Sequence, residues 1–312
     1  MKIGYPCINR SVQCSGSKTF RLASYSEARL KETVANNLSC LERIISYNAE
    51  RGILFFRVSS DIVPFASHPV CVFGWQGHFR GGLERIGARI RAHRMRISMH
   101  PDQFTLINSH DEEIYDRSVR ELRYHCELLD LCGLDRTAKV QIHVGGVYGD
   151  KPASMDRFVR RYARLGDAVR RRLVIENDDR LYTVSDCLEL HARTGVPVLL
   201  DVFHREINPD GLSLKESFKK TAATWLKRDG LPMVDYSSQL KGARPGSHAV
   251  ALDPRRFKKF LADSRPADFD LMLEIKDKEK SALRAIRIAA GDPRLRAFKK
   301  GLTKSCRASS MS

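Results

Sequence analysis

The segment LVIEND, residues 173–178, is a short apolar run that ends in carboxylates. The pattern recurs on both sides of it, where an acidic residue or a histidine closes the runs RISMH (96–100), VQIH (140–143), VLLDVFH (198–204) and LMLEI (271–275), and Asp235 lies within MVDYSS (233–238). A buried parallel strand is rich in Val, Ile and Leu throughout. Polar groups at the ends of successive strands converge only if the strands lie side by side and parallel, as at the carboxyl end of a (β/α)8 barrel. The runs therefore predict an α/β fold, a single (β/α)8 TIM barrel with a metal site at the C-terminal strand ends.

Strand-like and helical patterns alternate about eight times along the chain. We expect strands near 2–8, 54–60, 96–100, 139–144, 172–178, 197–204, 232–238 and 269–275. Apolar residues at helical spacing predict helices over 30–45, 112–132 and 158–169, and capping boxes at 183–186 and 213–216 predict two more helix starts. Such alternation predicts a parallel sheet, and eight units predict closure. The rival fold, a doubly wound open sheet, is disfavoured because no GxGxxG follows the first strand.

We expect one domain over residues 1–293 and a basic, Ser-rich, mobile tail over 294–312. The eight cysteines form no CxxC pair, which predicts reduced and mostly buried thiols in a cytosolic protein. No apolar run approaches the length of a membrane span, and no signal peptide opens the chain. We therefore expect a soluble, cytoplasmic protein of prokaryotic type. Nothing in the sequence demands a dimer, so a monomer is expected.

The chain is strongly basic. It carries 54 Lys and Arg against 37 Asp and Glu, a formal net charge of +17. Such an excess favours a polyanionic partner, because phosphate backbones attract it at long range without sequence readout. A generally basic or ribosome-associated protein is the alternative that charge alone leaves open.

The strand-end residues suggest how metal ions are held. His100, His143 and Glu176 close adjacent strands, and two imidazoles with one carboxylate form a three-ligand shell that leaves a position open for water. Glu176 has a second oxygen with which to bridge to another ion, held by Asp201 and Glu274 with Asp235 between them. His204 and His248 are candidates for a third ion, although His248 is equally consistent with an ordinary loop histidine.

Several metals at one site suit phosphodiester hydrolysis. Cleavage needs hydroxide near neutral pH and positive charge on the attacking and leaving oxygens, and paired metals supply both. A basic protein with such a site is a candidate nuclease. A sugar isomerase barrel also binds divalent metals at strand ends, but it has no evident need for so basic a surface.

At this point the motifs identify a resemblance. The chain resembles the UV damage endonucleases, which are related in fold to endonuclease IV. The matching segments span about residues 1–290 in family order: KIGYP, FFRVSSDIVPFASHP, RISMHPDQF, QIHVGGVYGDK, LVIENDD, LLDVFH, DYSSQ, GSHA and LMLEIKDKE.

The resemblance implies a DNA repair endonuclease with up to three divalent ions, usually Mn2+, with Zn2+, Co2+ or Mg2+ as alternatives. It implies incision of double-stranded DNA immediately 5′ of cyclobutane pyrimidine dimers and 6-4 photoproducts, with abasic sites also cut. Metal-activated hydroxide would leave a 3′-hydroxyl and a 5′-phosphate. Such an enzyme would associate with the nucleoid through its DNA.

The resemblance also assigns residues. The implied metal ligands are His100, His143, Glu176, Asp201, His204, His248 and Glu274. His68 matches a histidine of the site with a phosphate or metal contact, and we group it with Glu176 as catalytic. Tyr5, Gln103 and Phe104 match residues that probe the DNA at the lesion. An inserted side chain fills the gap when a damaged, poorly stacked base is flipped out.

Two departures from the family pattern concern the seventh strand. Met233 and Asp235 stand where some members have a lysine, modified in at least one relative, and a histidine. Met233 cannot bind metal in that way, whereas Asp235 offers a hard oxygen that favours Mn2+ or Mg2+ over Zn2+. A further expectation is a phosphate contact by Lys151, which follows the pair Gly145-Gly146.

Three other functions remain open from the sequence. An abasic-site endonuclease like endonuclease IV would have similar ligands. A metal-dependent sugar isomerase or epimerase would have a similar barrel, although Gln103-Phe104 argues against it. A catalytically inactive lesion-binding protein is the third, and the intact ligand set argues against that.

Overall fold

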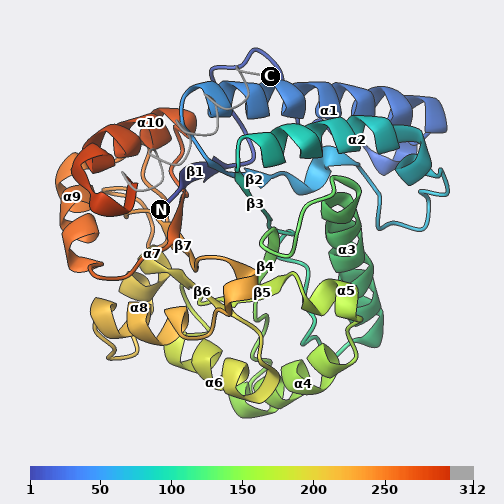
Figure 1. Ribbon diagram of the computed structural model, residues 1–312. Coiled ribbons are helices and arrows are strands. Elements are labelled where there is room, and N and C mark those ends of the chain that lie inside the picture. Colours follow the sequence, from blue (N-terminus) through green and yellow to red (C-terminus); the bar gives the residue numbers. More distant parts are fainter. Residues whose placement is uncertain (296–312) are drawn as a thin grey trace.

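The computed structural model describes residues 1–295, in which eight parallel strands close into a barrel in sequential order, surrounded by helices (Figure 1). The barrel is therefore the one predicted from the apolar runs. Each strand has four or five residues and is shorter than its run in the sequence. The strands are β1 (Ile3–Pro6), β2 (Phe55–Val58), β3 (Arg96–Met99), β4 (Lys139–His143), β5 (Leu173–Glu176), β6 (Val198–Asp201), β7 (Met233–Tyr236) and β8 (Asp270–Leu273).

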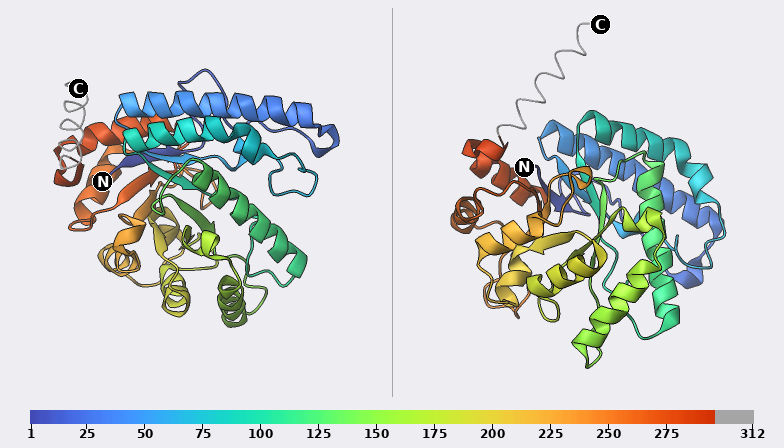
Figure 2. Two further views of the ribbon diagram at one scale, coloured as in Figure 1. Left: turned by 45° about the vertical axis from the view of Figure 1, so that its right-hand side comes forward. Right: turned by 60° about the horizontal axis from the view of Figure 1, so that its bottom comes forward.

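Ten α-helices of the described chain cover the barrel, with α1 and α2 side by side over one flank (Figures 1 and 2). Short 3-10 turns lie at Leu22–Ser24, Ser60–Ile62, Lys227–Asp229 and Ala289–Gly291. The helices are α1 (Glu27–Glu50), α2 (Trp75–Ala92), α3 (Glu112–Leu131), α4 (Lys151–Ala163), α5 (Asp167–Arg170), α6 (Val184–Thr194), α7 (Val202–Ile207), α8 (Leu214–Ala222), α9 (Pro254–Asp263) and α10 (Glu279–Ile288).

Two expected helix starts are confirmed, whereas one expected helix is divided and one expected strand ends early. The capping boxes of α6 and α8 are both formed. The helix expected over 158–169 is divided, because Gly166 is extended and caps α5 separately. The strand expected to run to His204 ends at Asp201, whose carboxylate accepts the His204 N–H and starts α7. His204 therefore lies in the first turn of a helix.

The inside of the barrel is built in levels. At the amino ends of the strands, a floor of buried ion pairs joins Arg96 to Asp270, and Lys139 to Asp229. Above it lies an apolar cluster with Trp225 at its lower edge: Phe55, Val174, Leu199, Trp225, Met233 and Met272. Because side chains alternate along a strand, Met233 is two residues below Asp235 in this cluster and is fully buried. The polar strand-end residues form the level above.

The expectation of reduced cysteines is wrong for one pair. Cys14, on the β1–α1 connection, forms a disulfide with Cys40 of α1 across 26 residues of chain. Sequence spacing gave no sign of it, because this pairing depends on how the connection folds back over the helix. Cys126, Cys132 and Cys187 are buried thiols as expected, and Cys7 and Cys71 are half-buried.

The expected tail, 294–312, falls almost wholly outside the described residues. Arg294 itself belongs to the barrel, where its guanidinium donates to Asp292 and to the carbonyls of Leu261 and Ala267. Within residues 1–295, no helix has the length and apolar character needed to cross a membrane.

Candidate metal centre

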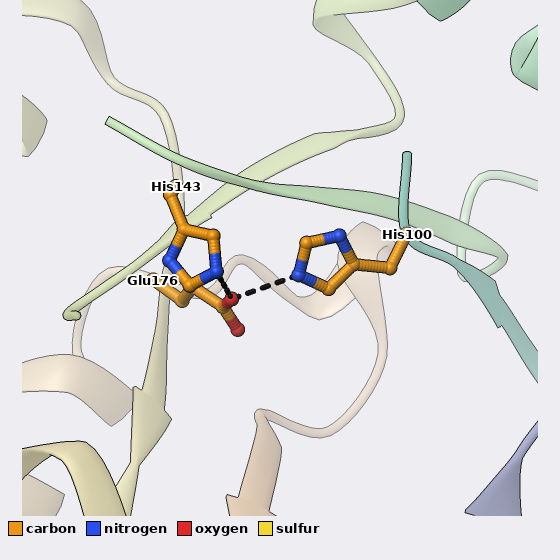
Figure 3. A group of neighbouring side chains, drawn as sticks. All are labelled: His100, His143 and Glu176. Carbon is orange, nitrogen blue, oxygen red and sulfur yellow. Dashed lines mark hydrogen bonds and ion pairs between the residues drawn. The ribbon is translucent and has the colours of Figure 1, made fainter. Parts of the chain in front are cut away.

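The first ligand group joins three neighbouring strands. His100 directly follows β3, and His143 and Glu176 are the last residues of β4 and β5. The Nε2 atoms of His100 and His143 lie 2.9 and 3.0 Å from the same oxygen of Glu176, Oε1 (Figure 3). The sequence therefore predicted correctly that these side chains meet.

The geometry of this group fits a bound cation. His100 Nδ1 lies 2.6 Å from the carbonyl oxygen of Pro101, so it carries the proton and donates it. In a neutral imidazole, Nε2 then presents a lone pair to a carboxylate oxygen, and the two repel unless a proton or a metal ion lies between them. Metal-binding histidines usually donate their other N–H to a carbonyl or carboxylate in this way.

The carboxylate of Glu176 is held in its charged form. Burial alone would raise its pKa, but His143 and His100 lower the pKa well below its usual range. Its other oxygen, Oε2, accepts a hydrogen bond of 2.7 Å from Gln141 Nε2. Glu176 is therefore ionised and fixed on both sides.

A second group consists of Asp201, Asp235 and Glu274, at the ends of β6, β7 and β8, with oxygens within 4.8 Å of one another. Burial, opposed by His204, raises the pKa of Asp201 to about 7. Asp201 overcomes the burial of His204 and raises the pKa of that imidazole to about 9. Asp201 also accepts the His204 N–H at 2.7 Å, so one carboxylate both caps α7 and faces the site.

His248 is oriented towards this second group. Its Nδ1 lies 2.7 Å from the Glu274 carbonyl oxygen, and its Nε2 lies 3.8 Å from Glu274 Oε2. The ring centroids of His100, His143, His204 and His248 follow one another at 5.3, 5.9 and 6.2 Å. The β7–α9 connection thus brings His248 into a continuous arc of four imidazoles, a position that favours a ligand over an ordinary loop histidine.

Arg57, on β2, is a site residue that the sequence argument did not single out. Its guanidinium donates to Glu274, to Asp235 Oδ2 at 2.6 Å and to Gln141 Oε1 at 2.9 Å. Burial would raise the pKa of Glu274, but Arg57 outweighs it and lowers the pKa to about 2. The available signal was a lone basic residue inside the apolar run FFRV.

The expected lesion-probing residues separate in the structure. Gln103 and Phe104 are exposed on the β3–α3 connection, and Phe104 is 72% exposed. Tyr5 is fully buried, and its hydroxyl donates to Asn48 of α1 and accepts from Asn9. The structure contradicts the expected contact of Tyr5 with DNA. The Tyr5 side chain faces the helices because its neighbours on β1 face the barrel interior, and no surface of this side chain is open to a base.

His68 and Lys151 lie outside both ligand groups. His68 is exposed on the β2–α2 connection, where its Nδ1 accepts the Val70 N–H at 3.1 Å. The Lys151 ammonium forms an ion pair of 2.8 Å with Asp186. Neither residue has a contact with the ligand groups among the described residues.

The rim of the barrel carries exposed apolar side chains and a cleft. A cleft of about 400 Å3 opens beside His100, His248 and Glu274, and Lys276 and Lys278 also line it. Large exposed apolar side chains lie mostly on the connections that follow strands: Ile8, Leu22, Val72, Phe104, Tyr148, Leu181 and Val250. This end of the barrel therefore combines metal ligands, lysines and exposed apolar groups.

Comparisons with known proteins identify a family. The family model described as UV-endonuclease UvdE matches residues 1–301. A UV DNA damage endonuclease of Clostridium perfringens is 35% identical over 288 residues, covering 92% of this chain and 70% of that protein. One from Bacillus cereus is 32% identical, covering 92% and 93%.

Of two similar solved structures, one resembles this chain in sequence and fold and the other in fold alone. The crystal structure of SacUVDE is 40% identical, has a TM-score of 0.89 and covers 93% of this chain and 98% of that one. A 3-keto-D-glucoside 4-epimerase from E. coli has a TM-score of 0.53 at 14% identity, covering 92% and 98%, and so shares the fold alone.

Proposed function

Since the chain belongs to the UV-endonuclease UvdE family, a family of endonucleases acting on DNA, we propose that it incises double-stranded DNA immediately 5′ of UV photoproducts, leaving a 3′-hydroxyl and a 5′-phosphate. Cyclobutane pyrimidine dimers and 6-4 photoproducts are the proposed lesions, with abasic sites as a further substrate. The observation that carries the proposal is the pair of imidazole Nε2 atoms directed at one oxygen of Glu176, next to a second carboxylate group.

The donor set fits divalent ions, and we propose Mn2+. Imidazole alone would suit Zn2+ or Co2+, while carboxylates suit Mn2+ and Mg2+, so a mixed set with an acidic second group favours Mn2+. His100, His143 and Glu176 would hold one ion, with Asp201, His204, His248 and Glu274 on the other side of Glu176. When bound, such ions supply Lewis-acid charge for the phosphate oxygens and make water more acidic.

The protein's own residues orient these ligands and exclude water from them. The Pro101 carbonyl fixes His100, Gln141 fixes Glu176, and the start of α7 fixes Asp201. Glu176 and Asp201 are buried, which limits the access of bulk water to both carboxylates. A phosphodiester reaching the cleft would meet Lys276 and Lys278 at its edge.

Gln103 and Phe104 would recognise the lesion. An exposed ring on the rim can stack in the gap left by a flipped dinucleotide, and a crosslinked dimer costs less to flip than normal bases.

The two other residues expected to contact DNA, Lys151 and His68, have more limited proposed roles. Lys151 would contact phosphate with the N–H donors that its ion pair with Asp186 leaves free, and His68 would contact only DNA that extends over the β2–α2 connection. The +17 charge supports binding to the DNA backbone. We propose that the enzyme acts as a monomer on chromosomal DNA in a bacterial-type cytoplasm.

An incision assay tests the proposal. A labelled duplex with one thymine dimer is compared with abasic and undamaged duplexes, in Mn2+ and in EDTA. We expect a cut directly 5′ of the dimer in Mn2+ only. Cutting of the abasic duplex alone would instead assign the role of endonuclease IV, and no cutting by Mn2+-loaded protein would reject the nuclease.

A matched pair of variants separates catalysis from binding. Glu176→Ala should abolish incision and still bind the dimer duplex, whereas Glu189→Ala, which removes an exposed carboxylate of α6, should cut normally. Normal cutting by Glu176→Ala would show that the ligand assignment is wrong.

A further inference from the structure

Arg57 is an unusual residue to find at a metal centre. It lies on β2 at the level of the ligand groups, and only 3% of its surface is exposed. A guanidinium remains protonated in proteins, so a permanent positive charge is buried among the carboxylates. A buried charge is tolerated only where it is paired and hydrogen-bonded.

Within the second group, Arg57 pairs with Glu274 and Asp235. Its two terminal nitrogens bridge Glu274 and Asp235, and one of them also donates to Gln141. Gln141 in turn donates from Nε2 to Asp235 Oδ2 at 2.8 Å and to Glu176 Oε2 at 2.7 Å. Arg57, Gln141 and Asp235 thus form a closed network that ends on the two glutamates.

This network leaves Asp235 poorly placed as a metal ligand. Its Oδ2 already receives hydrogen bonds from Arg57 and Gln141. Its Oδ1 is buried and has no hydrogen-bond partner among the described residues, so it is the one oxygen of Asp235 that remains open to an ion. A divalent ion at Oδ1 would share the carboxylate of Asp235 with the guanidinium, and the two positive charges would repel each other in a buried, weakly screened setting.

We propose that Arg57 takes the place of a metal ion between Asp235 and Glu274, so that this chain holds two divalent ions and not three. One ion belongs to His100, His143 and Glu176. The other belongs to Asp201 and His204 with the side of Glu274 that faces His248. Asp235 then serves as the counter-ion that positions Arg57, and Arg57 positions Glu274. The inference rests on the proposed metal dependence, but its test requires no DNA.

The test counts metal ions. The full-length chain and its variants are stripped with a chelator, reloaded with Mn2+ and passed over a desalting column, and Mn is measured per chain by mass spectrometry. The wild-type chain should hold two ions. Arg57→Gln, which leaves Asp235 and Glu274 without their cation, should gain a third.

Two further variants separate this role from a purely structural one. Arg57→Lys keeps the charge and should hold two ions. Asp235→Asn should also hold two, because Asp235 is not a ligand, and this count tests the ligand assignment even if Arg57→Gln fails to fold. A merely structural Arg57 would lower the count or leave it unchanged in Arg57→Gln, and would not raise it.

Three results would overturn the inference alone: three ions in the wild type, loss of one ion in Asp235→Asn, or an unchanged count in folded Arg57→Gln. A wild-type chain that binds no Mn2+ would overturn the proposed metal-dependent function together with it. The two failures are therefore distinguishable.

Discussion

Replacement of Phe104 by alanine should weaken binding to damaged DNA and leave the fold intact. The ring is 72% exposed, and its backbone N–H is held by Asp102 Oδ1 at 2.8 Å, a bond that alanine would keep. Exposed substitutions of this kind change the free energy of unfolding by less than about 0.5 kcal/mol. The variant should therefore fold as the wild type does.

The expected size of the binding effect follows from stacking. A base stacked on an aromatic side chain contributes about 1–3 kcal/mol, as judged by alanine substitution. Loss of that energy raises the Kd for a thymine-dimer duplex by about 5- to 150-fold. An undamaged duplex offers no gap for the ring, so its Kd should hardly change.

Fluorescence anisotropy of labelled duplexes in EDTA measures both dissociation constants without incision. Phe104→Tyr should bind as the wild type does, because it keeps the stacking face. Val72→Ala is a matched control, since Val72 is 90% exposed on the neighbouring β2–α2 connection. Equal losses on damaged and undamaged DNA, or no loss on either, would refute the stacking role of Phe104.

Three further predictions concern the floor, the disulfide and the charge. Asp229→Asn leaves the buried Lys139 ammonium, 2.6 Å away, without its counter-ion. It should lower the free energy of unfolding by about 3–5 kcal/mol in urea titrations and leave the Mn2+ content unchanged. A loss below about 1 kcal/mol would contradict the ion-pair assignment. Cys14→Ser opens the loop of 26 residues that the bond to Cys40 closes. Under oxidising conditions it should lower the free energy of unfolding by about 3 kcal/mol, and in reductant it should have no effect. An effect that persists in reductant would point to lost packing instead. Affinity for undamaged duplex should fall by about 10^3- to 10^5-fold between about 50 and 200 mM salt if about 6–10 phosphates are contacted, and a flat salt dependence would show that the net charge of +17 does not serve DNA binding.

The barrel could be predicted because its signal is local. From β3 to β8, each strand is an apolar run with a histidine or an acidic residue at or next to its carboxyl end, and parallel packing brings these ends together whatever the details of the loops. The group of His100, His143 and Glu176 follows from that rule directly, since the three lie at the carboxyl ends of adjacent strands. The break between α4 and α5 was missed, because Phe158, Tyr162 and Val169 keep a helical spacing across Gly166.

The remaining misses depend on contacts between distant segments. Arg57 is a basic residue in a strand, and only closure of the barrel shows that it reaches Asp235, 178 residues further along the chain. Tyr5 was assigned to the DNA by family resemblance, but the alternation of side chains along β1 turns it towards Asn48. Gly4 faces inward beside it, where any Cβ would collide with the Phe55 carbonyl oxygen. The Cys14–Cys40 bond likewise depends on the fold of a connection that has no regular pattern.

The apolar cluster between the floor and the metal ligands has a consequence for how this protein can change. It separates the buried ion pairs at the amino ends of the strands from the candidate metal ligands at the carboxyl ends. Mutations in the connections after the strands can therefore accumulate while the ion pairs at the opposite end still stabilise the barrel. Protein engineers could exchange those connections to seek new lesion preferences and leave the amino ends of the strands unchanged.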